Sequence, residues 1–282
     1  MSLTPFRERQ IRYYIQQVEK GAYLSVSGEL RQSLAHADSY SLEEALAICD
    51  MCKDYRTVLS PPRNEPAVLV ACECSSIVQQ AFTSRGIPAW SCDLLPAFNG
   101  SSAFRHIQDD VLQVLNHMPW SLVIAHPPCT YLCSSGMHWT TRGKRDPQLT
   151  EDALALVRKL LDCAPRVCVE NPVGVISTRI RKPEQYIQPY NFGEDASKKT
   201  GLWLKGLPLL EPTNYIEPRI IDGKPRWANQ TDSGQNRLRP SPDRCRRRSV
   251  TYPGIAAAMA EQWGRLILPY NKCTKNTTTI NE

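Results

Sequence analysis

The chain has 282 residues, 41% of them hydrophobic, and a formal net charge of +6. This length suffices for one large α/β domain with an accessory piece or for two small domains, and the hydrophobic fraction supports a packed core. No apolar run approaches the ~20 residues of a membrane-spanning helix, and the polar N-terminus does not have the pattern of a signal peptide. We therefore expect a soluble cytoplasmic protein.

The eleven cysteines form no regular disulfide framework. Cys72, Cys92 and Cys168 fall inside expected strands, which favours free thiols in a reducing compartment. The Cys49-x-x-Cys52 spacing has no second pair of ligands and lies in a helical pattern, so we expect no metal.

The positive charge is concentrated between positions 219 and 248, a segment that contains nine Lys or Arg and only three Asp. A polar, basic segment of this kind suits the phosphate backbone of a nucleic acid, although a solvated surface loop would have the same composition. The residues expected to bind phosphates are Arg237, Arg239, Arg244, Arg246, Arg247 and Arg248.

Residues 1–60 are expected to form a helical N-terminal extension without strands. Ser41-Leu-Glu-Glu44 is a capping box, and apolar residues follow it at roughly helical spacing. The proline-rich stretch that follows reads as a linker. We see no catalytic residues in this extension.

Alternating strands and helices begin at residue 67. A strand at 67–72, a helix at 77–85 and a strand at 88–92 form a βαβ unit, and Asp93 follows the second strand. An acidic residue at this position suits the ribose of a nucleoside cofactor. The turn at 73–76 has no glycine, however, and a strand-end Asp can also be a simple turn residue.

The apolar run 121–125 is too short for a helix and predicts a buried strand. Pro127 and Pro128 end this strand, because neither can donate a hydrogen bond to a sheet. Cys129 is therefore expected on a stiff loop at the carboxyl edge of a sheet, where open α/β sheets bind ligands. The alternative is an ordinary buried thiol.

The same pattern recurs at 166–172, where a strand runs into Glu170-Asn171-Pro172. The intervening segment has room for one crossover, with a loop-like stretch at 133–145 and a helix at 150–163. If the two strands are neighbours, Cys129 and Glu170 lie close together. A third strand at 104–107 places Asp109 and Asp110 at the same edge.

The remaining elements are two extended runs at 186–192 and 200–204, a last helix at 254–267 and a polar tail at 271–282 that is expected to be disordered.

Together these motifs resemble the cytosine-C5 DNA methyltransferases, and most of all the compact bacteriophage type. The resemblance covers about residues 67–267. It is carried by His126-Pro-Pro-Cys-Thr-Tyr-Leu132, Val169-Glu-Asn-Pro172, Gln188-Pro-Tyr-Asn-Phe-Gly193, Lys198-Lys-Thr-Gly-Leu-Trp203, Thr251-Tyr-Pro-Gly-Ile-Ala256 and Ala258-Met-Ala-Glu-Gln-Trp263.

The resemblance implies a Rossmann-like sheet that binds S-adenosyl-L-methionine and methylates a flipped cytosine of double-stranded DNA. Cys129 matches the nucleophile that adds to C6, and Glu170 the carboxyl that holds N3 and the amino group. Asp93 matches the acid on the cofactor ribose, and Asp110 the acid near the adenine amine. The implied catalytic residues are Cys129, Glu170, Asn171 and Lys199. The implied cofactor-binding residues are Cys72, Glu73, Ser75, Asp93, Leu94, Asp110 and Pro127. Lys198 is expected to bind the nucleic acid together with the six arginines named above.

The resemblance also implies a domain plan and a monomer. The expected order is a helical extension at 1–60, a catalytic core at 66–204, a basic target-recognition segment at 205–250, a closing helix at 251–268 and a tail at 269–282. The recognition segment is short, so we expect loose or very short sequence specificity. A bacteriophage protein of this type would work in the cytoplasm of the host cell.

The sequence departs from the family at two places, and other functions stay open. The family's glycine-rich first turn is Ala71-Cys-Glu-Cys-Ser-Ser76 here, and the Gln that follows the nucleophile is Thr130. An amino-methyltransferase, a methylase of RNA or of free nucleotides, and a non-catalytic protein that binds DNA or a host protein are the alternatives. For Glu170 to donate a proton, burial is expected to raise its pKa.

Overall fold

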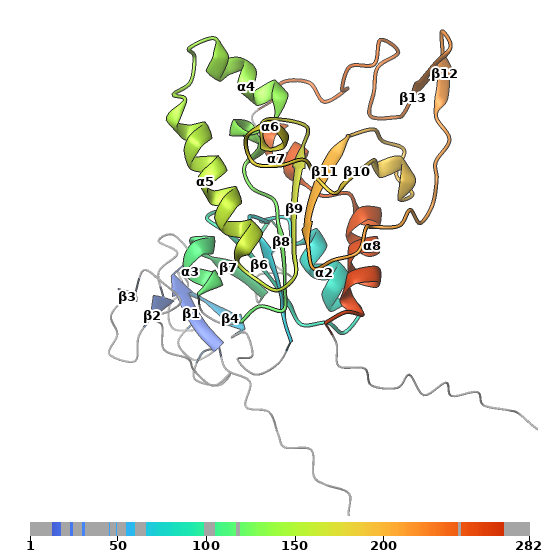
Figure 1. Ribbon diagram of the computed structural model, residues 1–282. Helices are drawn as coiled ribbons and strands as arrows, with labels where there is room; N and C mark the ends of the chain where they lie inside the picture. The colour runs from blue at the N-terminus through green and yellow to red at the C-terminus, as the bar shows by residue number, and fades with distance from the viewer. Residues whose placement is uncertain are drawn as a thin grey trace, which may run out of the picture.

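The computed structural model describes residues 13–17, 23–24, 30–31, 45, 49, 55–59, 66–98, 105–116, 119–241 and 244–267. The ribbon in Figure 1 shows a central sheet with helices on both faces.

The central sheet has seven strands in the order β10-β11-β9-β8-β5-β6-β7. The five strands from β9 to β7 in this order are parallel, and β10 and β11 are antiparallel to their neighbours. This architecture confirms the expected Rossmann-like α/β fold. The bounds are β5 Val68–Ala71, β6 Ala89–Asp93, β7 His106–Gln108, β8 Leu122–Ala125, β9 Val167–Pro172, β10 Gln185–Ile187 and β11 Thr200–Lys205.

Helices cover both faces of this sheet, so its central strands are entirely apolar and buried. Helices α2 (Ile77–Thr83) and α8 (Pro253–Gly264) enclose one half of the core around Phe82 and Trp263. The other half of the core contains Trp90 and Trp203 and includes residues of three further helices. These are α3 Val111–Leu115, α5 Gln148–Asp162 and α6 Ile176–Arg179.

The expectation that residues 1–60 form a helical extension without strands is wrong. The chain contains a small antiparallel sheet in the order β3-β2-β1-β4, with β1 at Tyr13–Gln17, β2 at Tyr23–Leu24, β3 at Leu30–Arg31 and β4 at Tyr55–Leu59. Strands β1 and β4 are rich in aromatic and β-branched residues, which fit a pleated sheet. Ala45 and Cys49 are helical, as the capping box predicts; Cys52 lies outside the described residues.

The segment 133–145 was expected to be a loop, but it contains helix α4 (Ser134–Thr141). Its Ser-Ser-Gly sequence suggests a hinge, whereas Gly136 serves close packing: a Cβ there would lie 2.1 Å from the carbonyl oxygen of Thr130. The glycine lets the helix lie directly on the preceding loop.

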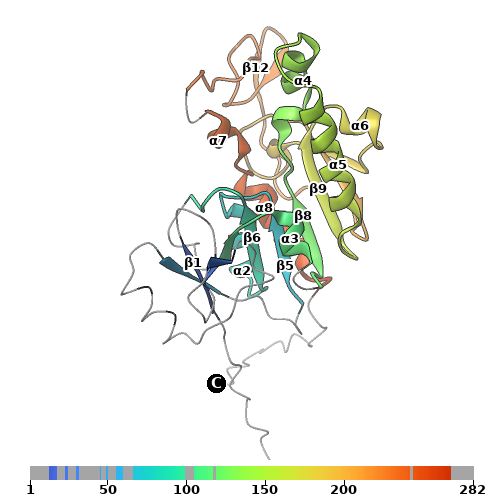
Figure 2. The same cartoon turned by 90° about the vertical axis from the view of Figure 1, so that its left-hand side faces the viewer.

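The basic segment forms the hairpin of β12 (Arg219–Ile221) and β13 (Lys224–Arg226), irregular loops and the short helix α7 (Arg244–Ser249). Trp227 anchors this segment by stacking on Tyr190, with ring centroids 4.2 Å apart. Figures 1 and 2 show α4, α7 and the hairpin at the same end of the molecule. The domain boundaries given above stay predictions, and the tail at 269–282 lies outside the described residues.

None of the helices in the described ranges is long and apolar enough to cross a membrane. Within the same ranges, no group of three or more His, Cys, Asp or Glu side chains is placed to hold a metal ion.

Candidate functional site

The carboxyl ends of β8 and β9 form the centre of the site. The two strands pair in parallel, with Ala125 opposite Val169, so His126 and Glu170 follow side by side. Nδ1 of His126 lies 3.1 Å from Oε2 of Glu170, and Nδ2 of Asn171 donates to the carbonyl of Pro127 at 2.8 Å. The predicted proximity of the two proline-ended strands is confirmed.

The loop that carries Cys129 is a short 3-10 turn, η3 (Cys129–Tyr131). Arg145 holds this turn: its Nη1 donates to the carbonyl of Thr130 at 2.6 Å and to that of Gly136 at 3.2 Å. The Arg145 guanidinium also lies over the ring of Tyr131. The stiffness of the loop therefore comes from a guanidinium and a close helix contact as well as from the prolines.

Cys129 has a second thiol beside it, Cys133, to which it donates a hydrogen bond. This hydrogen bond, then burial, raise the pKa of Cys129 well above its ordinary value. The same hydrogen bond, with one from Ser135 and the charge of Arg248, lowers the pKa of Cys133 to about 5 against the effect of burial. The two thiols therefore form one coupled pair at the carboxyl edge of the sheet.

Glu170 differs from the sequence expectation in its ionisation. Burial acts to raise the pKa of this carboxyl, but the hydrogen bond from His126, the charges of Lys198 and His126, and the hydroxyl of Thr200 hold the pKa below its ordinary value. The expected raised pKa is wrong because the sequence did not reveal the histidine contact. Glu170 is therefore ionised in the resting site.

The two predicted lysines, Lys198 and Lys199, interact with different parts of the protein. Lys198 acts electrostatically on both Cys129 and Glu170, and its Nζ donates to the carbonyl of Arg248 at 3.3 Å. Nζ of Lys199 instead lies 4.5 Å from the ring centroid of Tyr186 on β10. Neighbouring side chains of an extended segment point to opposite sides, so the structure brings Lys198 to the site and gives the predicted catalytic role of Lys199 no support.

The first turn of the core takes unusual backbone conformations without glycine. Cys72 and Ser76 have φ angles of 58° and 59°, a left-handed conformation that costs a residue with a side chain roughly 1–2 kcal/mol. Glu73 fills the turn: its side chain accepts from the amides of Val78 and Gln79 at 2.8 and 3.3 Å. The Oγ of Ser75 also donates to it, at 3.0 Å. Burial raises the pKa of Glu73.

The predicted acids Asp93 and Asp110 end β6 and begin α3. Oδ1 of Asp93 accepts from the amide of Leu95 at 2.9 Å, and Oδ1 of Asp110 caps α3 through Leu112 at 2.9 Å. Burial raises the pKa of Asp93. Beside them, Leu94 is 72% exposed, so this end of the sheet offers carboxylates and an apolar surface together.

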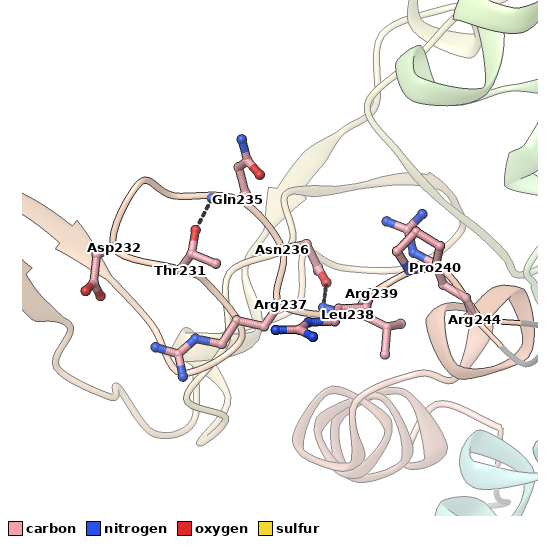
Figure 3. A pocket seen from close by; sticks show the side chains of 9 residues that line it. All are labelled: Thr231, Asp232, Gln235, Asn236, Arg237, Leu238, Arg239, Pro240 and Arg244. Atoms are coloured by element: carbon pink, nitrogen blue, oxygen red, sulfur yellow. Dashed lines mark hydrogen bonds between the residues drawn. The ribbon is translucent and has the colours of Figure 1, made fainter.

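The predicted phosphate-binding arginines line two neighbouring cavities. The first, of about 640 Å³, is drawn in Figure 3, where Arg237 and Arg239 lie along the loop that follows Thr231 and Arg244 lies at the start of α7. The second, of about 560 Å³, contains Lys198, Arg237, Arg247, Arg248 and Tyr252. Arg246 instead lies over the ring of Phe98, 3.9 Å from its centroid.

Sequence reasoning missed three residues of the site: His126, Cys133 and Arg145. The histidine directly precedes the two prolines, and the second cysteine follows Cys129 by four residues, which is one helical turn. Both signals were present in the sequence. The arginine carries no local signal, because its partners lie in the preceding turn and helix.

Comparison with known proteins yields no matching family model and no matching curated protein. Solved structures with a similar arrangement include an Entamoeba histolytica methyltransferase, EhMeth (TM-score 0.34, 11% identity, 55% of this chain and 58% of that one). A Schizosaccharomyces pombe Dnmt2 methyltransferase has TM-score 0.33 and 15% identity over 52% of this chain and 51% of that one. A mutant Spodoptera frugiperda DNMT2 has TM-score 0.35 and 12% identity over 57% of each. The chain spans a little over half the length of these proteins, so we argue function from the site itself.

Proposed function

We propose that this protein transfers a methyl group from S-adenosyl-L-methionine to C5 of cytosine in DNA, with Cys129 as the nucleophile. The observation that supports this most is the parallel pairing of β8 and β9, which brings the Cys129 loop and Glu170 to one edge of the sheet. A thiol next to a carboxylate on two rigid strand ends suits addition to a pyrimidine held between them.

The chemistry accounts for both residue types. Cytosine C5 is too weak a nucleophile to take a methyl group unaided, and a thiolate bond to C6 makes C5 enamine-like. The adduct is stabilised when N3 takes a proton from the Glu170 side. Loss of the C5 proton to water then expels the Cys129 sulfur. Because C6 is buried in the base stack of a duplex, the target base has to leave the helix.

At one end of the proposed cofactor site the residues suit the cofactor, whereas at the other end they differ from those of the family. Asp93 and Asp110 offer carboxylates to ribose hydroxyls and to an adenine amine, and exposed Leu94 offers an apolar surface to a ring. Two buried atoms of this site have no hydrogen-bond partner among the described residues: Nε2 of His126 and Oδ1 of Asn171. These polar atoms suit a ligand. When bound, the cofactor would supply an electrophilic methyl group.

Glu73 changes the methionine end of that site. A buried carboxyl group, already hydrogen-bonded to the amides of Val78 and Gln79, stands where the family has a glycine turn. This residue is also the observation that favours a second function, a methyltransferase fold that binds DNA without catalysis. Cys129 and Glu170, which a pure binding protein does not need, favour the enzyme.

The basic surface supports a nucleic acid as the substrate. Lys198 acts on the catalytic pair and also lines the second cavity beside Arg237, Arg247 and Arg248. A phosphodiester bound there would lie next to the base site. Such contacts position a nucleic acid and carry no sequence information themselves.

The test is methyl transfer from labelled S-adenosyl-L-methionine to duplex DNA, single-stranded DNA, RNA and deoxycytidine monophosphate, followed by digestion and mass spectrometry. We expect 5-methylcytosine from duplex DNA, lost in Cys129→Ala and retained in Cys163→Ala, a half-buried cysteine at the end of α5. N4-methylcytosine, or activity that survives Cys129→Ala, refutes the mechanism. Cofactor-independent DNA binding without any product favours the binding protein.

A further inference from the structure

His126 is a side chain that the proposed reaction has not yet used, and it touches the catalytic carboxylate. It directly precedes the two prolines at the end of β8, and its backbone N–H donates to the carbonyl of Ala71 at 2.9 Å, which fixes its place at the sheet edge. Its side chain is 9% exposed, and Nδ1 lies 3.1 Å from Oε2 of Glu170. The imidazole is thus held in one orientation against the carboxylate.

The addition step needs a proton that Glu170 does not carry by itself. Attack of the thiolate on C6 breaks the C5=C6 π bond and moves electrons through C4 onto N3, so N3 has to gain a proton. Glu170 is ionised in the resting site, since His126, Lys198 and Thr200 together favour its carboxylate. The nearest group that can give a proton to this carboxylate is the N–H of the imidazole.

The charges around His126 suit a shared proton. Two carboxyl groups feel the charge of His126: Glu170 from β9 and Glu73 from the turn after β5. From the segment before β11, Lys198 acts on Glu170, and Thr200 at the start of β11 also favours its carboxylate form. A proton shared between the nitrogen and the oxygen would lie in a water-poor site, where such bonds are strong.

We propose that His126 and Glu170 share one proton, which passes from His126 through Glu170 to N3 of the target cytosine as Cys129 adds to C6. The inference rests on the proposed function. The sulfur–C6 bond forms as the C5=C6 π bond breaks, the proton on Nδ1 of His126 moves to Glu170, and Glu170 delivers it to N3. When water takes the C5 proton and the sulfur–C6 bond breaks, N3 returns its proton through Glu170 to His126 and the pair is restored. His126 acts through Glu170 and is a positioning residue.

The test is the pH dependence of single-turnover methyl transfer in His126→Gln. The amide of Gln can still donate a hydrogen bond to Glu170 but has no proton to transfer. At about pH 7.5 we expect the rate to fall by about 100-fold or more. The remaining rate should rise about tenfold for each unit by which the pH is lowered, as Glu170 itself becomes protonated. The wild-type rate should lack this tenfold rise per unit.

Two controls separate this role from a structural one. His138→Gln makes the same change at an exposed position of α4 and should keep the wild-type rate and pH profile. Affinities for DNA and for S-adenosyl-L-methionine should stay within about threefold in His126→Gln, because the proton moves only in the reaction. A pH profile of wild-type shape in His126→Gln, or a rate loss matched by lost affinity, overturns the relay.

A second variant serves if His126→Gln does not fold. His126→Asn also keeps an amide and carries no transferable proton, so it should show the same loss of rate and the same rise as the pH is lowered. A pH profile of wild-type shape in this variant overturns the relay. Wild-type protein that forms no 5-methylcytosine refutes the proposed function, and the relay with it. A Cys129-dependent product that forms at the wild-type rate in the His126 variant refutes the relay alone.

Discussion

Gly136→Ala tests whether contact with α4 sets the position of the nucleophile. A Cβ on residue 136 would lie 2.1 Å from the carbonyl oxygen and 2.9 Å from the carbonyl carbon of Thr130, and 3.3 Å from the carbonyl oxygen of Cys129. Cβ atoms essentially never approach other atoms within 3.0 Å, so the turn and the helix have to separate by about 1 Å. Arg145 resists this, because it is hydrogen-bonded to the carbonyls of both Thr130 and Gly136.

The displacement sets the expected magnitudes. Overpacking of this kind costs about 1–3 kcal/mol, and a chain of this size loses about 2–4 °C of melting temperature per kcal/mol. A misplacement of about 1 Å at a reacting group costs about 100-fold in rate. We therefore expect Gly136→Ala to fold, to melt several degrees lower and to lose about 100-fold in single-turnover methyl transfer, measured beside a thermal melt.

Gly143→Ala is the matched control. Gly143 follows the same helix, has a φ of 66° and has nothing within 4 Å of an added Cβ. Its substitution costs roughly 1–2 kcal/mol of backbone strain without touching the Cys129 turn. It should melt lower while keeping its rate. Equal rates in the two variants would refute the reasoning.

Three further predictions follow from the same structure. Cys133→Ala removes the acceptor whose hydrogen bond raises the pKa of Cys129, so iodoacetamide should alkylate Cys129 faster at about pH 8, read by peptide mass spectrometry; an unchanged rate contradicts the pairing. The pKa of Glu170 lies below its ordinary 4.5 in the folded protein, so its contribution to stability is present above about pH 4.5 and is lost as the pH falls. Between about pH 6 and about pH 3 the melting temperature of the wild type should thus drop more than that of Glu170→Gln, and parallel curves would disprove this. Arg237→Ala and Arg248→Ala should each reduce the slope of log affinity for duplex DNA against log salt by about 1, while exposed Arg265→Ala on the far end of α8 leaves it unchanged; unaltered slopes in the first two would exclude phosphate contacts.

The central sheet could be predicted because its signals are local. The apolar runs before Pro127 and Pro172 are too short for helices, and proline cannot continue a sheet ladder, so each strand ends where the sequence indicates. A single crossover between them makes the strands parallel. The proximity of Cys129 and Glu170 follows from that topology without any side-chain detail.

The N-terminal sheet could not be predicted in this way. Strand β1 pairs with β4, with Tyr13 opposite Leu59, although more than 40 residues separate these two positions in the sequence. The helical pattern after Ser41 lies between these strands, and it led to the prediction that the whole segment is helical. Strand preference depends on the neighbouring strand, so it is weakly visible in sequence.

The pKa shifts of the site residues could not be predicted either, because they depend on contacts between residues that are distant in the sequence. The pKa of Glu170 depends on His126, which precedes it by 44 residues, and on Lys198, which follows by 28. From sequence, only burial could be anticipated, and burial acts in the opposite direction. The sign of the shift therefore required the contact itself.

The position of Cys129 is determined by packing on every side of its loop. Gly136 holds it from α4 and Arg145 from the segment after α4. Asn171 holds the carbonyl of Pro127 from β9, and a Cβ at Gly174 would lie 1.9 Å from the carbonyl oxygen of Leu132. If this thiol acts as we propose, it cannot follow a base into the stack, so the base would have to come to the thiol. That extrusion would cost a few kcal/mol, and the contacts able to offset it are those of Lys198 and the arginine-lined cavities beside it. On this proposal, the basic segment would supply the binding energy that the rigid Cys129 loop requires.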